Sequence, residues 1–170
     1  MDLSHITPEA LKRLNKSELD SLCAALRGEI ISAVSENGGH LASNLGAVEL
    51  TVALLRAFDL PRDQIIFDVG HQCYAYKLLT GREAAFHTLR TYQGISGFPN
   101  RNESEADLFT TGHASNAISL ATGLIRARRL NREPGSTVAV LGDGALTGGM
   151  CYEGLSDAGS NNLPLIVILN

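Results

Sequence analysis

One acidic residue in this chain is placed where it could hold a metal ion against a phosphate group. Asp143 lies between two glycines, after the apolar run TVAVL. A carboxylate beside the free amides of a helix start would repel a phosphate directly, and a divalent cation between the two removes that conflict. Mg²⁺ prefers such hard oxygen ligands. We therefore predict that Asp143 is the first ligand of Mg²⁺, and that Asn170, after the next apolar run, is a candidate second ligand.

This glycine-rich turn matches two commoner phosphate-binding motifs less well. The dinucleotide-binding pattern requires a third glycine where Thr147 stands, and no lysine follows the glycines as it does in a Walker loop. On spacing alone, an ordinary strand-to-helix turn with an acidic residue at the helix start remains the alternative.

Three of the five histidines directly follow a glycine in a loop. They are His40, His71 and His113, in the tripeptides GGH, VGH and TGH. Any one of them alone is more often a surface or hydrogen-bonding residue than a catalyst. Three together weaken that alternative, because imidazole donates to phosphate oxygens and titrates near physiological pH, which suits proton transfer. All three are candidate site residues.

The spacing of apolar residues predicts the elements that position these side chains. Helices are expected over residues 17–37, with Ser17 as the cap, and over 46–58, 74–79, 83–89 and 115–130. A buried strand is expected over 64–70, and a strand, a helix and a second strand over 137–170. Residues 91–112 show no clear period and are expected to form a long loop.

Strands that alternate with helices predict an α/β fold with three α/β/α layers around a mainly parallel sheet. In such sheets ligands collect beyond the carboxyl ends of the strands, where His71 and the turn at 142–144 are expected. The length of 170 residues suits one domain, spanning residues 1–170.

Composition gives few reasons to expect a macromolecular partner. The net charge of −4 does not favour nucleic acid. A basic run, expected to be solvated, lies near a predicted helix end and comprises Arg126, Arg128, Arg129 and Arg132. Three widely spaced cysteines suggest neither a disulfide framework nor a zinc site, so the cytoplasm is expected. We also expect no membrane association, since no apolar run approaches the length of a spanning helix.

Four segments together resemble the 1-deoxy-D-xylulose-5-phosphate synthase family, which belongs to the transketolase-like thiamine-diphosphate enzymes. The resemblance runs from about residue 28 to the end and rests on GGHLASNLGAVELTVAL, FDVGHQCYAYKLLTGR, GISGFPNRNESEADLF and GDGALTGGMCYEG. It implies a truncated thiamine-diphosphate-binding fold, like the pyrophosphate domain of transketolase. It also implies an enzyme that uses thiamine diphosphate and Mg²⁺ to condense pyruvate with glyceraldehyde 3-phosphate, giving 1-deoxy-D-xylulose 5-phosphate and CO₂.

The same resemblance implies roles for individual residues and for the assembly. The family's product serves isoprenoid, thiamine and pyridoxal phosphate synthesis, and the parent enzyme is expected to be a homodimer. His40 and His71 are the expected catalytic residues. Ala114 stands where family members commonly carry serine. The expected cofactor-binding residues are His71, Gly112, His113, Ala114, Gly144, Ala145 and Asn170, with Asp143 as the metal ligand.

The resemblance further implies that complete family members are several hundred residues longer. They commonly read Asn-Asp-Asn at the position of Asn170, so we expect this residue to be the first of that triplet. The chain is accordingly expected to be an amino-terminal part, inactive alone, with an apolar edge exposed. A subunit of a split transketolase-like enzyme and a non-catalytic binding module are the alternatives.

Overall fold

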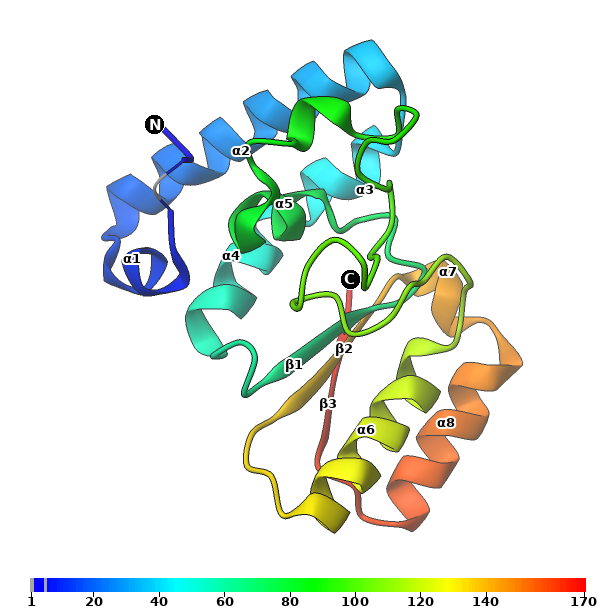
Figure 1. The fold of residues 1–170 in the computed structure, drawn as a ribbon. Coiled ribbons are helices and arrows are strands. Elements are labelled where there is room, and N and C mark those ends of the chain that lie inside the picture. The colour runs from blue at the N-terminus through cyan, green and yellow to red at the C-terminus, as the bar shows by residue number, and fades with distance from the viewer. Residues whose placement is uncertain (1, 5) are drawn as a thin grey trace.

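The computed structural model describes residues 2–4 and 6–170, and its centre is a parallel sheet (Figure 1). The register pairs Ile65 with Val138 and Val138 with Ile166, so the strands run side by side and end at one edge. The runs QIIF, TVAVL and LIVIL are rich in β-branched residues, which favour strands. In spatial order the strands are β1 (Gln64–Phe67), β2 (Thr137–Leu141) and β3 (Leu165–Leu169).

Helices cover both faces of this sheet (Figure 1). The first group precedes β2 along the chain and comprises α1 (Pro8–Arg13), α2 (Lys16–Asn37), α3 (Leu41–Gly46), α4 (Val48–Ala57), α5 (Tyr74–Lys77), the π-helical turn η1 (Leu78–Arg82) and the 3₁₀ turn η2 (Phe86–Thr88). The second group comprises α6 (Ala117–Asn131), α7 (Asp143–Leu146) and α8 (Gly149–Ser160).

Alternate strand residues enter two separate cores. One core joins the sheet to the first group of helices, and its strand residues are Ile65, Phe67, Val138 and Val140. The other core joins the sheet to α6 and α8, and its strand residues are Ile66, Ala139 and Leu141. Because successive side chains of a strand point to opposite faces, this division confirms the predicted three-layer α/β/α architecture with a parallel sheet.

Several predicted boundaries need correction. α2 begins after Asn15, which forms a capping box with Glu18, so Ser17 is not the cap. The predicted helix over 46–58 is α4, preceded by a separate short helix, α3, which the apolar spacing did not indicate. The strand predicted over 64–70 ends earlier, because Val69 and Gly70 adopt left-handed φ angles that turn the chain away.

The basic run near the end of α6 is not uniformly solvated as predicted. Arg128 is 6 % exposed. Its guanidinium donates to the carbonyl oxygens of Arg62, Pro134 and Ser136, and so joins the loop before β2 to the loop before β1. The prediction failed because the acceptors of this side chain are backbone groups of loops outside the helix, and one of them, Arg62, is far from it in sequence.

The last strand leaves apolar side chains in solvent. Ile166, Val167 and Leu169 of β3 are exposed, on the open edge of the sheet. This confirms the expected apolar edge. Among the described residues, no helix is both long and apolar enough to cross a membrane.

Candidate functional site

The turn that carries Asp143 lies at the carboxyl edge of the sheet, beside the end of β3. The amide of Asp143 donates to the carbonyl oxygen of Asn170 at 3.2 Å, and the amide of Asn170 donates to that of Leu141 at 2.8 Å. Gly142 is extended, so Asp143 is the first residue of α7. The Asp143 carboxylate accepts the amide of Gly144 at 2.7 Å. Asp143 and Asn170 are both exposed, and their oxygen-bearing side chains thus follow the ends of the adjacent strands β2 and β3.

The loop that carries Gly112, His113 and Ala114 is tied to this turn. These three residues are exposed, whereas Ser115 is buried and has a left-handed φ of 71°. The Ser115 hydroxyl donates to the carbonyl oxygen of Ala145 at 2.7 Å. The structure therefore brings the two predicted cofactor-binding segments against each other through a residue that the sequence had not singled out.

Asp68, directly after β1, connects a third loop to the same edge. Its carboxylate is 1 % exposed and accepts the amides of Ser115 at 2.7 Å and Ala117 at 2.9 Å. Amides at a helix start lack partners within the helix, and their dipoles favour an anion. The Thr111 hydroxyl also donates to the carbonyl oxygen of Val69 at 3.1 Å. The loop that leads to His71 and the loop of residues 111–115 are therefore held together.

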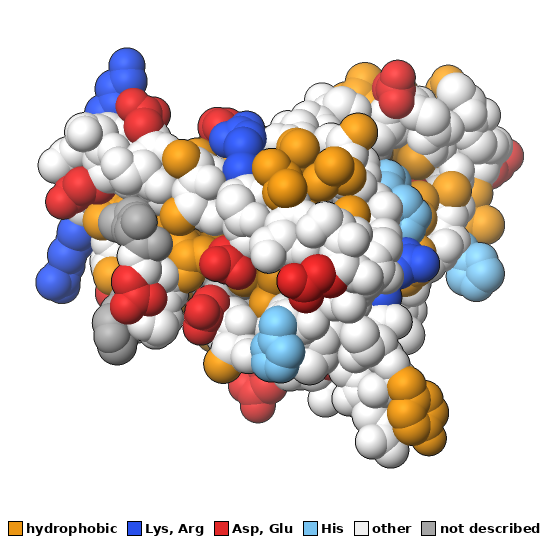
Figure 2. Space-filling view, turned by 90° about the horizontal axis from the view of Figure 1, so that it is seen from above, with side chains coloured by type: hydrophobic (Ala, Val, Ile, Leu, Met, Phe, Trp, Pro, Cys, Tyr) orange, Lys and Arg blue, Asp and Glu red, His pale blue; other side chains and the backbone are white. Residues whose placement is uncertain are grey.

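His40 and His71 lie in contact although they are far apart in sequence. Their ring centroids are 5.2 Å apart at an interplanar angle of 63°, and the ring of Phe98 lies 5.8 Å from that of His40. Both histidines are partly exposed, and Figure 2 shows histidine side chains reaching the surface. The Nδ1 atoms of both rings are buried, without a hydrogen-bond partner among the described residues. Buried polar atoms without a partner are uncommon in folded proteins, and they can mark a functional site.

Asn44 holds the two histidine loops in place. Its side chain is almost fully buried, and its amide nitrogen donates to the carbonyl oxygens of His40 at 2.6 Å and His71 at 2.7 Å. Its oxygen accepts the amide of Tyr74 at 2.9 Å, while the Tyr74 hydroxyl accepts the amide of His40 at 3.3 Å. The side chains of Asn44 and Tyr74 therefore hold the backbone of both histidine loops, and this keeps the two rings in contact.

The surroundings of His71 favour its neutral form. Burial lowers the pKa of His71, and repulsion from His40 lowers it further, while the Asp68 carboxylate opposes both effects. A neutral imidazole carries one donor nitrogen and one acceptor nitrogen. At pH 7 this ring can therefore either give or take a hydrogen bond from a bound molecule.

The oxygen atoms at the end of β2 and β3 suit a hard cation. Among the described residues, no group of three His, Cys, Asp or Glu side chains is arranged to hold a metal ion. A Mg²⁺ ion here would take oxygens from Asp143 and Asn170, and its other positions would go to phosphate oxygens and water, as is common for this ion. The donor chemistry fits the prediction for Asp143, which remains a prediction.

Sequence reasoning missed the residues that hold these loops together, namely Asp68, Asn44, Phe98 and Ser115. The sequence did contain a signal for Asp68, because this acidic residue directly follows the apolar run that forms β1. Asp143 similarly comes two residues after the end of β2. No periodic pattern points to Asn44 or Phe98, because their contacts join segments distant in sequence.

Comparison with known proteins places the chain among close relatives. The family model described as 1-deoxy-D-xylulose-5-phosphate synthase matches residues 3–170. The synthase of Desulforudis audaxviator is 56% identical over 168 residues, which make up 99% of this chain and 26% of that protein. The synthases of Clostridium beijerinckii and Treponema pallidum are 55% and 54% identical over 96% and 100% of this chain. The chain thus spans about a quarter of the length of these curated relatives.

A solved structure supports the architecture. Transketolase from Leishmania mexicana superposes with a TM-score of 0.76 at 23% sequence identity, over 89% of this chain and 27% of that one. At this identity the likeness shows a shared fold, that of a transketolase-like α/β domain, and nothing finer.

Proposed function

Because the chain belongs to the 1-deoxy-D-xylulose-5-phosphate synthase family, we propose that it is the diphosphate-binding part of such a synthase. The proposed reaction condenses pyruvate with glyceraldehyde 3-phosphate to give 1-deoxy-D-xylulose 5-phosphate and CO₂, using thiamine diphosphate and Mg²⁺. Residues 1–170 are proposed to act as one cofactor-binding domain, inactive without the remainder of the synthase. The split-enzyme and binding-module alternatives are less favoured, since the matched relatives are synthases.

The arrangement at the carboxyl edge of the sheet carries this proposal. Asp143 opens α7 beside Asn170, and the segment 112–114 is bound to Ala145 through Ser115. We assign Asp143 to the metal, Asn170 to that metal and the diphosphate beside it, and the backbone of 112–114 and 144–145 to the diphosphate. Glycines in both segments let the backbone approach phosphate oxygens closely. Thiamine diphosphate, when bound, supplies the nucleophilic carbon and the electron sink.

The histidine pair is assigned to proton transfer and substrate orientation. His71, whose pKa is lowered, is neutral at pH 7 and can accept a proton at one ring nitrogen while it donates a hydrogen bond from the other. His40 lies in contact with it and also has a buried, unpartnered Nδ1. His71 is assigned in addition to cofactor contact and His113 to the wall of the cofactor cleft.

Assembly and location belong to the same proposal. We place the intact enzyme in the cytoplasm as a homodimer that acts on small molecules, apart from membranes and nucleic acids. The three cysteines Cys23, Cys73 and Cys151 are all free thiols, as is usual in a reducing compartment.

Calorimetry on the product of the complete reading frame tests the cofactor assignment. We expect thiamine diphosphate to bind in the presence of Mg²⁺ and to lose at least tenfold in affinity when EDTA removes the metal. Asp143→Ala should lower the affinity similarly, since removing a ligand leaves the metal weakly held. Asp20→Ala, which removes an exposed carboxylate on α2, is the matched control and should bind normally.

Normal, Mg²⁺-dependent affinity in Asp143→Ala would refute the assigned metal role. Failure of the wild-type protein to bind the cofactor under any metal condition would refute the proposed function itself.

A further inference from the structure

The loop of residues 91–112 carries an aromatic side chain to the histidine pair. It contains no helix or strand, yet it holds the ring of Phe98 at 5.8 Å from that of His40. We propose that Phe98 contacts substrate as an apolar wall for the methyl group of pyruvate, and that a buried ion cluster positions it. This inference rests on the proposed function and assigns a residue that the sequence had not indicated.

The ion cluster consists of Lys77, Arg82, Glu103 and Asp107. Lys77 pairs with Glu103 and lies 3.9 Å from Asp107, while Arg82 pairs with Asp107 and lies 3.9 Å from Glu103. The side chains of Lys77 and Asp107 are 0% exposed. Burying a charge is costly unless it is paired, so the two cations of α5 and η1 hold the two carboxylates of the loop in one arrangement.

Both carboxylates of the loop hold backbone amides on either side of Phe98. Glu103 Oε1 accepts the amide of Ser96 at 2.7 Å, and Asp107 Oδ2 accepts the amide of Asn100 at 2.8 Å. The amide of Phe98 itself donates to the Ser96 hydroxyl at 3.1 Å. The backbone that presents the ring is therefore tied to the cluster two residues before it and two residues after it.

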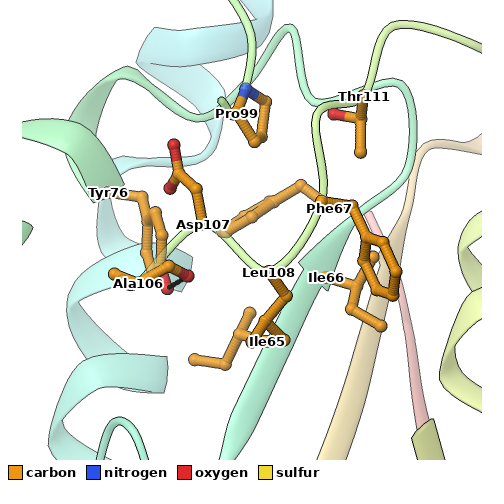
Figure 3. Close-up of a pocket in the computed structure, with 10 residues that line it drawn as sticks. Ile65, Ile66, Phe67, Tyr76, Pro99, Ala106, Asp107, Leu108 and Thr111 are labelled. Atoms are coloured by element: carbon orange, nitrogen blue, oxygen red, sulfur yellow. Dashed lines mark hydrogen bonds between the residues drawn. The ribbon is translucent and has the colours of Figure 1, made fainter. Parts of the chain in front are cut away.

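Pro99, the residue after Phe98, packs against Gly70 in the loop that leads to His71. A Cβ atom at Gly70, where φ is +85°, would lie 2.3 Å from Pro99 Cδ, so only glycine allows this approach. The amide of Thr111 donates to the Pro99 carbonyl oxygen at 3.2 Å. Pro99 and Asp107 both line the pocket drawn in Figure 3. The cavity that remains between this loop and β1 is only ≈ 10 Å³, about one water molecule.

The chemistry of the ring suggests a preference between substrates. Phe98 and His40 are both partly exposed, so each can face a bound molecule. A phenyl ring cannot accept or donate a conventional hydrogen bond. A hydroxyl group that packs against the ring therefore gives up a hydrogen bond to water without gaining a new one. The wall therefore favours the methyl group of pyruvate over the hydroxymethyl group of hydroxypyruvate.

Steady-state kinetics on the complete synthase test the role of Phe98. Phe98→Gln should raise KM for pyruvate roughly three- to tenfold. KM for hydroxypyruvate should change much less, and Phe98→Leu, which keeps an apolar surface, should recover most of the preference. Tyr92→Gln is the matched control, since Tyr92 lies in the same loop and is 92% exposed.

Two outcomes would overturn this assignment. KM values for the two substrates that stay unchanged, or rise equally, in Phe98→Gln would show that Phe98 does not select the methyl group. Such a result with an active wild type refutes only this inference, whereas a wild type without synthase activity refutes the proposed function as well.

To test whether the ion cluster positions Phe98, the measurement must distinguish a displaced Phe98 from a protein that is partly misfolded. Glu103→Gln keeps an oxygen for the Ser96 amide but leaves Lys77 with only the more distant carboxylate of Asp107. Misfolding lowers the active fraction and hence kcat, whereas a misplaced Phe98 lowers the preference for pyruvate. We expect the preference to fall roughly threefold or more in Glu103→Gln and to recover in Lys77→Met/Glu103→Gln, where both charges are removed. An unchanged preference in Glu103→Gln would overturn the positioning role.

Discussion

The hydroxyl of Ser115 donates a hydrogen bond of 2.7 Å to the carbonyl oxygen of Ala145. Ser115 lies in the loop before α6 and Ala145 lies in the short helix α7, so the bond directly links the two predicted diphosphate-binding segments. The fit is close, since a Cβ atom at Gly148 would lie 2.0 Å from Ser115 Oγ. The geometry of the carboxyl edge therefore depends on this hydroxyl and on the carboxylate of Asp68 behind it.

Replacing Asp68 with asparagine should loosen the start of α6. The buried carboxylate accepts the amides of Ser115 and Ala117, and an asparagine can accept only through one oxygen. A buried amide left without an acceptor costs about 1–3 kcal/mol. Amide hydrogen exchange should therefore show protection at Ser115 or Ala117 reduced roughly tenfold or more. Exchange at these amides should stay unchanged in Asp20→Asn, and unchanged protection in Asp68→Asn would contradict the prediction.

Ser115→Ala should weaken cofactor binding without unfolding the protein. Loss of one neutral hydrogen bond is worth about 0.5–1.5 kcal/mol, which corresponds to a two- to tenfold rise in Kd. Calorimetry with thiamine diphosphate and Mg²⁺ on the complete synthase measures this change. Ser156→Ala, on the exposed side of α8, is the control. Equal affinities in the two variants would show that the bond to Ala145 does not shape the diphosphate site.

The sequence was informative where short-range patterns decide the structure. The nearly continuous burial of β1 and β2 and the turn at 142–144 follow from uninterrupted apolar runs and from glycine, and they were predicted. α3 was missed because it spans only six residues, with the sequence LASNLG, and only Ala47 separates it from α4. Short helices carry little periodic signal.

The sequence predicted the residues whose side chains could bind a ligand, but it did not predict the residues that hold the loops of the site in place. Asp143 and Asn170 are neighbours because parallel strands end at one edge, which could be argued from the sequence. The buried position of Arg128 and the bridging role of Asn44 depend on contacts between loops. Such contacts arise only when the chain has folded, and no local pattern encodes them.

Replacing His40 with glutamine should raise the pKa of His71. Repulsion from His40 is the second cause of the lowered value and burial is the first, so the pKa should rise without reaching the ordinary value of about 6.5. NMR titration of the His71 Cε1 proton measures it. His87→Gln, an exposed substitution in η2, should leave the titration unchanged. A pKa of His71 that stays the same in His40→Gln would show that the two rings do not interact electrostatically.

The lowered pKa of His71 also sets the sign of a stability effect. The unfolded chain binds a proton at this ring more readily than the folded chain does, so acid favours unfolding. The contribution of His71 is complete above the ordinary histidine pKa of about 6.5 and is lost as pH falls through that value toward the folded-state pKa. Urea unfolding as a function of pH should therefore show a smaller loss in His40→Gln than in wild type.

Residues 1–170 expressed alone should self-associate through β3, and Val167→Lys should reduce this association. The open edge of β3 presents unpaired backbone groups and the exposed side chains of Ile166, Val167 and Leu169. Such an edge pairs readily with another chain, and a lysine opposes pairing because its charge would have to be buried or placed against a second lysine. Analytical ultracentrifugation should show a concentration-dependent increase in mass for wild type and mainly monomer for Val167→Lys. Tyr92→Lys adds the same charge to a distant exposed position, so equal association of the two variants would indicate a general charge effect and contradict the role of the edge.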